Sequence, residues 1–208
     1  MYDYQKNNTS PGCNASMVPD VIEPGNTNFC NTKPPMSAWA LLAVARASRD
    51  LQSAACALLP SLDLYRSWWL QHRVTASQGS SLPDNEVPLL QFGATDNRPE
   101  CMKWESGMDN APRFDFTKLK LVAPGTFLGD QFSVDLAAHS YGDWMSQALL
   151  ADMCGAPDMA ARLRADAAAL QTRAQAAFFS NATGFMHDLL LTGTLLRELG
   201  RDFNFAWL

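Results

Sequence analysis

The sequence has no long apolar run, no excess of positive charge and no closely spaced cysteine pair. No apolar run approaches the ~20 residues that a transmembrane helix needs, so we expect no membrane partner. The net charge of −5 argues against a nucleic-acid partner, because such proteins normally present a basic face. The chain does not open with a charged stretch followed by an apolar core, so no signal peptide is visible. This absence has weight only if Met1 is the native start.

Signals for bound metals are also missing. The five cysteines are widely spaced and form no Cys-x-x-Cys pair, which argues against a zinc site. The three histidines do not cluster in the sequence. The Asp-Asn pairs at 96–97 and 109–110 lack the D-x-D-x-D-G spacing of a calcium loop. We therefore expect neither a metal nor another cofactor.

The cysteines leave the redox state open. Cys56 and Cys154 fall on predicted helices, where we expect buried free thiols. Cys13 and Cys30 flank a polar loop and would form a disulfide if the protein were secreted. Asn-x-Ser/Thr sequons, which matter only in a secretory compartment, begin at Asn7, Asn8, Asn14 and Asn181. Neither the compartment nor the oligomeric state follows from these residues.

Helical periodicity dominates the chain, and strand signals are almost absent. Residues 1–33 are rich in Asn, Pro, Gly and Thr and are expected to be irregular. Five to six helices are expected in all, including 34–47, 50–74 with a break at Pro60, 130–155 and 158–178. The stretch 77–131 is too long for an ordinary connector, and its aromatic and charged content favours a functional loop. The fold class is therefore all-α.

The segment from Trp104 to Asp115 concentrates chemically active side chains. It carries three carboxylates, one guanidinium and two aromatic rings. Gly107 and Pro112 bracket its centre, which predicts a shaped loop rather than the interior of a helix. Aromatic faces stack on sugar rings, while carboxylates and Arg bind hydroxyls. Because a carboxylic acid beside such a platform can protonate a glycosidic oxygen, the segment indicates a carbohydrate site.

The same segment resembles the W-E-S-G-M-D-N-S-P-R-W-D signature of glycoside hydrolases built on an (α/α)6 toroid, the six-hairpin glycosidases. These are the mannosylglycerate and glucosylglycerate hydrolases, the family 63 α-glucosidases and, more distantly, the trehalases. The match departs at Ala111, where the family usually has Ser, and at Phe114, where it usually has Trp. Both departures leave the carboxylates and Arg113 in place.

Three further segments follow the order of that family. They are Lys33–Trp39 for K/Q-P-P-x-x-x-W, Trp68–Arg73 for W-W-L-x-x-R, and Val134–Leu136 for V-D-L. The resemblance covers about residues 26–190. It implies that residues 34–208 are a partial (α/α)6 glycosidase catalytic domain preceded by an irregular segment, 1–33.

The resemblance makes Asp109 the general acid; the alternative is an Asp that caps the loop or pairs with Arg113. Trp104 is expected to stack on a sugar ring in the substrate subsite, or else to lie in the core beneath the loop. Arg113 would bind a sugar hydroxyl or a substrate carboxylate, unless it forms an ion pair with Glu105 or Asp115.

Four other residues complete the predicted substrate contacts. Asn110 and Glu105 would hydrogen-bond sugar hydroxyls or instead shape the loop. Lys33 and Trp39 resemble positions at the mouth of the family's site, although the family often has Gln at the position of Lys33. The predicted partner is a small carbohydrate substrate.

A second carboxylate is needed to activate water on the opposite face of the sugar ring. The resemblance places that Glu in a later helix pair, and Glu198 reads as a helix surface residue. We therefore expect the base beyond Leu208, and the chain to be a fragment of a larger hydrolase with about half the toroid. The predicted function is an inverting hydrolase of a small α-glycoside. The alternatives are a catalytically inactive sugar-binding relative and a purely structural helical repeat.

Overall fold

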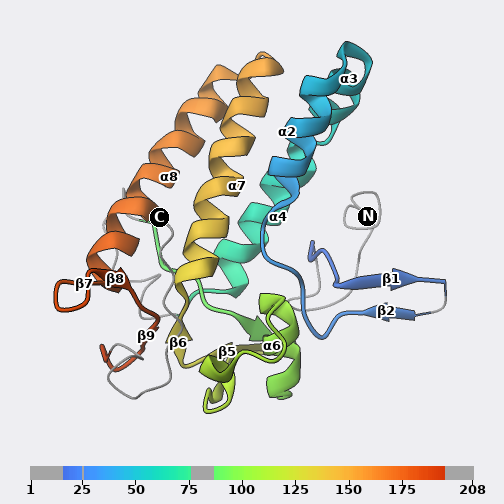
Figure 1. Cartoon of the computed structure of the whole chain (residues 1–208). Coiled ribbons are helices and arrows are strands. Elements are labelled where there is room, and N and C mark those ends of the chain that lie inside the picture. The colour runs from blue at the N-terminus through green and yellow to red at the C-terminus, as the bar shows by residue number, and fades with distance from the viewer. Residues whose placement is uncertain (1–15, 25, 76–86, 195–208) are drawn as a thin grey trace.

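The computed structural model describes residues 16–24, 26–75 and 87–194 (Figure 1). Six α-helices and nine short strands lie in these residues. The elements are β1 (Val21–Glu23), β2 (Asn26–Asn28), α2 (Ser37–Ala47), α3 (Arg49–Ala57), α4 (Leu59–His72), β3 (Gly93–Ala94), α6 (Pro99–Ser106), the 3₁₀ turn η2 (Pro112–Phe114), β4 (Leu119–Ala123), β5 (Thr126–Gly129), β6 (Gln131–Phe132), α7 (Val134–Met153), α8 (Pro157–Phe178), β7 (Phe179–Ser180), β8 (Phe185–Met186) and β9 (Leu189–Leu190).

The long hairpin of α7 and α8 confirms the two helices predicted for this part of the chain. Gly155 ends the first helix with a left-handed φ of 72°, and Pro157 occupies the first turn of the second. The face of α8 turned toward α7 is built from small and aliphatic residues, which let the two helices pack closely: Ala160, Leu163, Ala167, Leu170 and Ala174. Of the helices in the described ranges, none combines the length and apolar character needed to cross a bilayer.

The helices before this hairpin differ from the prediction mainly at their ends. The first begins at Ser37, and the predicted break at Pro60 lies instead at Leu58, between α3 and α4. Pro60 is tolerated inside the first turn of α4, where a backbone N–H has no helical partner. Trp68 and Trp69 on α4 are each 1% exposed and belong to the core. Figure 1 shows α2 standing beside α7, which extends the row of helices.

The expectation of an all-α chain with almost no strands is wrong in part. β1 and β2 form a hairpin within the segment predicted to be irregular. β3, β5 and β4 form a three-stranded antiparallel sheet, and β6–β9 and β7–β8 form two-stranded pairs. These strands have two to five residues, too few for alternation of apolar and polar residues to be visible in the sequence. The fold is therefore helical with small sheets at one end of the helices (Figure 1).

Two disulfides cross-link the chain, which corrects both expectations for the cysteines. Cys56 at the end of α3 is bonded to Cys154 after α7, so these residues are not free thiols. Cys30 is bonded to Cys101 on α6 rather than to Cys13, which lies outside the described residues. The partners are 98 and 71 residues apart, a distance over which sequence spacing carries no information on pairing.

Candidate active site

The helix α6 ends inside the segment that the sequence predicted as a loop. Trp104, Glu105 and Ser106 form its last turn, so the prediction of a loop is wrong for these three residues. Gly107 then adopts a left-handed φ of 70°, and its N–H donates to the carbonyl of Trp104 at 3.1 Å. This sharp end turns the chain outward, and Asp109 and Asn110 beyond it are exposed.

Glu105 is fully buried, and its carboxylate is surrounded by hydrogen-bond donors of the protein. Its carboxylate accepts two hydrogen bonds from Arg73, from Nε at 2.8 Å and from Nη2 at 2.7 Å. The backbone N–H groups of Gly93 (2.6 Å) and Thr32 (3.2 Å) donate to the same carboxylate. These contacts favour the alternative expected for Glu105, shaping of the loop, over contact with a sugar hydroxyl, because four protein donors surround a carboxylate that solvent does not reach. Glu105 instead fastens α6 to the end of α4, to β3 and to the segment before α2.

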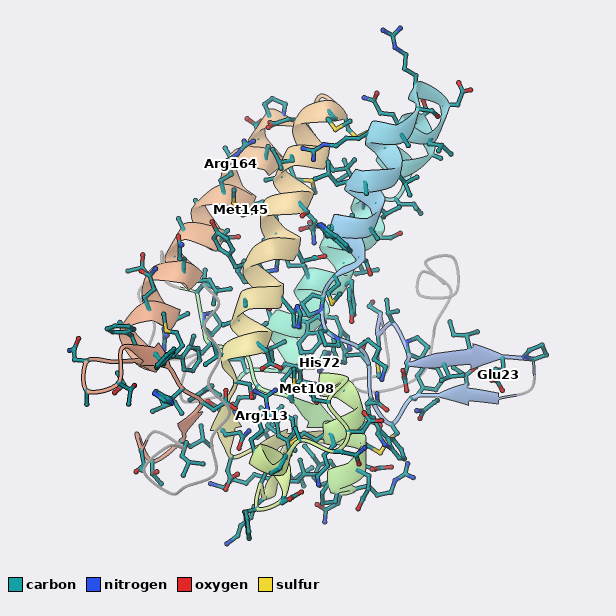
Figure 2. The ribbon with its side chains drawn as sticks, in the orientation of Figure 1. Glu23, His72, Met108, Arg113, Met145 and Arg164 are labelled. Carbon is teal, nitrogen blue, oxygen red and sulfur yellow. A yellow bond between two sulfur atoms is a disulfide. The ribbon has the colours of Figure 1, made fainter. Side chains whose placement is uncertain are left out.

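Arg113 is also buried, and its partners were not among those predicted. Nη1 donates to Asp188 Oδ2 at 3.0 Å, and Nη2 donates to Asp135. Arg113 is thus an ion-pair residue, as the alternative expected, but its partners are Asp188 and Asp135 in place of Glu105 or Asp115, and its burial argues against direct contact with a sugar. Asp115 pairs with Lys103 on the surface. In the side-chain view, Arg113 and Met108 lie close together near the first turn of α7 (Figure 2).

The charges around Arg113 are unequal, since one guanidinium faces two carboxylates. Burial alone would lower the pKa of Arg113, but Asp188 and Asp135 outweigh it and raise that pKa. Burial raises the pKa of Asp188 to about 6 against the attraction of Arg113. The other oxygen of Asp188 accepts the N–H of Val134 at 2.8 Å and so caps the start of α7. The cluster therefore joins the turn after Asp109 to α7 and to the segment before β9.

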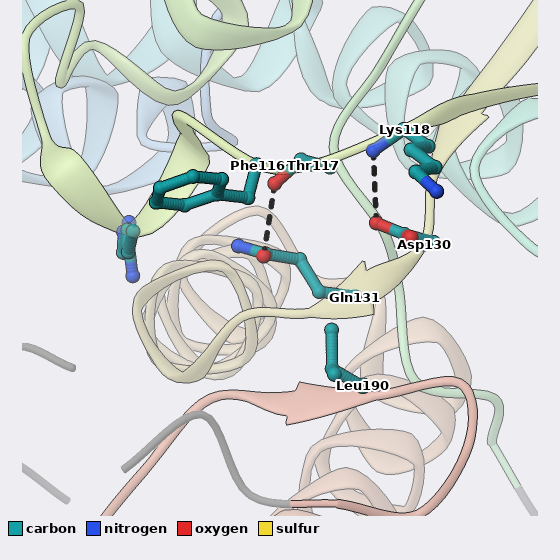
Figure 3. A pocket seen from close by; sticks show the side chains of 7 residues that line it. Phe116, Thr117, Lys118, Asp130, Gln131 and Leu190 are labelled. Carbon is teal, nitrogen blue, oxygen red and sulfur yellow. Dashed lines mark hydrogen bonds between the residues drawn. The ribbon is translucent and has the colours of Figure 1, made fainter. Parts of the chain in front are cut away.

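The chain on either side of this cluster is anchored in turn. The Thr117 hydroxyl donates to Gln131 Oε1 at 3.0 Å, and the Lys118 N–H donates to Asp130 Oδ1 at 3.0 Å (Figure 3). These bonds border a hollow of about 260 Å³ that is also lined by Arg113, Phe116 and Leu190. The segment after η2 is thus held against β6, the strand that leads into α7.

Lys33 lies against the end of α6, next to the backbone of Trp104. Lys33 Nζ donates to the Trp104 carbonyl at 2.7 Å and pairs with Asp20 at 3.2 Å. Trp104 is 36% exposed, so it does not lie in the core beneath the loop. Lys33 therefore connects the end of α6 to the segment that leads into α2, although its ammonium group is already held by two protein oxygens.

Trp39 on α2 is 65% exposed and borders a second hollow, of about 250 Å³. His139 and Asp143 of α7 line the same hollow. Asp143 is buried and accepts the N–H of Ala38 at 2.8 Å, which caps α2, and burial raises its pKa to about 6. Burial also lowers the pKa of His139. An exposed indole beside a hollow is a surface on which a sugar ring can stack.

Asp109 is left as a carboxylate with no hydrogen-bond or ion-pair partner in the described parts of the chain. Neither predicted alternative, capping of the loop or pairing with Arg113, is found there. Its turn is fixed at one end by α6 and at the other by the buried Arg113. Sequence reasoning did not foresee the supporting residues Arg73, Asp135 and Asp188. Arg73 and Asp135 lie inside two of the motifs that resemble the family, but no pattern in the sequence indicates which residues they pair with.

An accessible acid on a turn anchored at both ends, with an exposed indole on the last helical turn before it, is an arrangement suited to cleaving a glycosidic bond. The family model of the mannosylglycerate hydrolase MGH1-like glycoside hydrolase domain matches residues 2–205. The chain therefore belongs to this family, as its four motifs indicated. It is a glycosidase, and its substrate is a carbohydrate.

Proposed function

We propose that Asp109 is the general acid of an inverting glycosidase that cleaves a small α-glycoside, such as a glycosylglycerate or a glucosyl disaccharide. One observation carries this proposal. Of the three carboxylates between residues 104 and 115, Glu105 is held by Arg73 and Asp115 is held by Lys103. Among the three, only Asp109 is both exposed and without a cationic partner in the described residues, so its carboxyl is the one left free to meet a substrate.

The surroundings of Asp109 suit proton transfer to a bound sugar. Trp104, one turn before it, offers an exposed ring for stacking, and Asn110 offers an exposed amide for hydroxyls. The exposed ring of Trp39 extends the proposed substrate surface. Lys33, which is bonded to the end of α6, extends it further. The base that activates water is assigned to none of the described residues.

We further propose that the helices are part of an (α/α)6 toroid. The supporting features are the antiparallel hairpin of α7 and α8 and the position of α2 and α3 against α7. In such a toroid, loops from successive helix pairs gather at one end. The Asp109 turn and the segment before α2 come together at one end of the helices, joined by the bond between Lys33 and the Trp104 carbonyl.

The proposal is tested with Asp109→Asn in the full-length enzyme. Removal of a general acid should lower kcat on the natural substrate by about 10²–10⁴-fold, while the unfolding midpoint in urea stays unchanged because the side chain is exposed. A glycosyl fluoride, whose leaving group needs little protonation, should be cleaved at a rate much closer to that of the wild type.

Asp115→Asn is the matched control, because it removes an exposed carboxylate from the same segment and should leave kcat nearly unchanged. Wild-type turnover by the Asp109→Asn enzyme would refute the assignment of the acid. Sugar binding without any turnover by the wild-type enzyme would indicate an inactive relative instead.

A further inference from the structure

We infer that this protein matures in an oxidising secretory compartment and carries an N-linked glycan on Asn181, whose first sugar packs on the ring of Phe179. This inference does not rest on the proposed glycosidase mechanism. It combines three features of the molecule: two disulfides, an exposed sequon in a tight turn, and an exposed aromatic ring two residues before the acceptor.

The two cysteine pairs indicate the compartment. Their Cα–Cα distances are 5.6 and 5.5 Å, within the range that a disulfide requires. All four cysteines in the described residues are used, and each bond joins segments far apart in the chain. Such bonds persist in the secretory pathway and outside the cell, whereas cytosolic thiols are kept reduced.

A metal does not explain the same cysteines. Cys30, Cys101 and Asp96 offer three ligand atoms within 4.8 Å of one another, whereas a structural zinc site is closed by four ligands. The pair Cys56–Cys154 belongs to no group of three potential ligands in the described residues. Oxidation therefore accounts for both pairs, and a metal would account for one at most.

Asn181 lies in the turn between β7 and β8, directly after the long helix α8. The Ser180 carbonyl accepts the N–H groups of Thr183 at 3.2 Å and Gly184 at 2.8 Å, which closes the turn. Asn181, Ala182 and Thr183 form an Asn-x-Thr acceptor, and the residue between is not the proline that blocks modification. The Asn181 side chain is exposed and makes no hydrogen bond within the described residues. A glycan attached there extends into solvent and displaces no native contact.

The turn presents an apolar ring to that glycan. Phe179 is 45% exposed, and it precedes Asn181 by two residues, in the short strand β7 that leads directly into the turn. The apolar face of a sugar stacks on an aromatic ring, so the first sugar would cover Phe179. Phe185, across the turn, is 43% exposed, but it pairs with Ser180 in the ladder and belongs to the opposite face. It is thus a matched control.

The first experiment examines occupancy. The full-length protein is isolated from its own source and from a eukaryotic secretory host, and Asn181 is mapped by mass spectrometry after enzymatic removal of N-glycans, which converts a modified Asn to Asp. We expect conversion at Asn181 and no free thiol at the four paired cysteines. Thr183→Ser should retain the modification and Thr183→Ala should abolish it. An unmodified Asn181 in protein from both preparations, or free thiols in the native protein, would overturn the inference.

The second experiment examines the stacking contact. Melting temperatures are compared before and after glycan removal in the wild type, Phe179→Ala and Phe185→Ala. The glycan should raise the melting temperature of the wild type and Phe185→Ala by about 2–4 °C, the shift expected from one modest contact in a domain of this size. It should have no such effect on Phe179→Ala. An equal shift in all three proteins would show that the sugar does not pack on Phe179.

Discussion

Arg73 and Glu105, 32 residues apart in the chain, form a two-bond ion pair from which solvent is completely excluded. The guanidinium also lies over the ring of Trp68, 4.6 Å from its centroid. The pair joins the end of α4 to the last turn of α6. It therefore positions the turn that presents Asp109, while taking no part in the proposed chemistry itself.

Glu105→Gln should destabilise the protein by about 3–5 kcal/mol, because it leaves the buried charge of Arg73 without its counter-ion. Equilibrium unfolding in urea measures the loss. Asp96→Asn is the control: Asp96 pairs with Arg98 at the surface, where ion pairs contribute at most about 1 kcal/mol. Equal effects of the two substitutions would show that the buried pair contributes no more than an exposed one.

The Arg113 cluster should respond asymmetrically to mutation. Arg113→Gln removes the guanidinium that pairs with both Asp135 and Asp188 and should cost about 3–5 kcal/mol. Asp188→Asn should cost less, about 1–3 kcal/mol, because Asp135 still balances Arg113 and the amide oxygen can still accept the N–H of Val134, although the amide NH2 then replaces the acceptor of Arg113 Nη1. Unfolding midpoints at neutral pH distinguish the two. A larger loss in Asp188→Asn than in Arg113→Gln would contradict this account of the charges.

Asp143 should make the protein more stable in mild acid. Its pKa is raised by burial from 3.8 to about 6, so the folded state binds a proton more tightly than the unfolded state. The stabilisation is complete below about pH 4 and is lost as the pH rises through 6. The pKa of Asp143 thus differs by about 2 between the unfolded and folded states, which corresponds to about 3 kcal/mol in the free energy of unfolding.

Asp143→Asn should remove this part of the pH dependence, because Asn keeps an acceptor for the N–H of Ala38 and has no charge to desolvate. Urea unfolding at pH 4.5 and pH 7.5 measures the difference between the variant and the wild type. Parallel pH profiles for the two proteins would refute the assignment to Asp143.

The disulfide between Cys56 and Cys154 should stabilise the packing of α3 against the end of α7. Replacing both cysteines by Ser should cost about 2–5 kcal/mol, because the unfolded chain regains the freedom of a 98-residue loop. A reductant should lower the midpoint of the wild type and have a smaller effect on the variant, in which only the other disulfide remains. If the reductant destabilises both proteins equally, the bond does not contribute as expected.

Much of the local structure could be predicted from sequence patterns alone. The helices α7 and α8 are long and periodic, and Gly155 and Pro157 mark the boundary between them. The four motifs in their order indicate the glycosidase family from the sequence alone. These signals are short-range, because helix periodicity and turn chemistry depend on residues within a few positions of each other.

The tertiary structure alone decided which acidic and cationic groups of the site are available. Glu105 and Arg113 have the residue types of sugar-binding groups, yet both are buried in ion pairs with residues 32 and 75 positions away. Asp109 has no such partner in the described residues, and nothing in the local sequence distinguishes it from Glu105 in this respect. Pairing across such distances depends on how the helices pack, and packing is set by the whole chain rather than by any one segment of it.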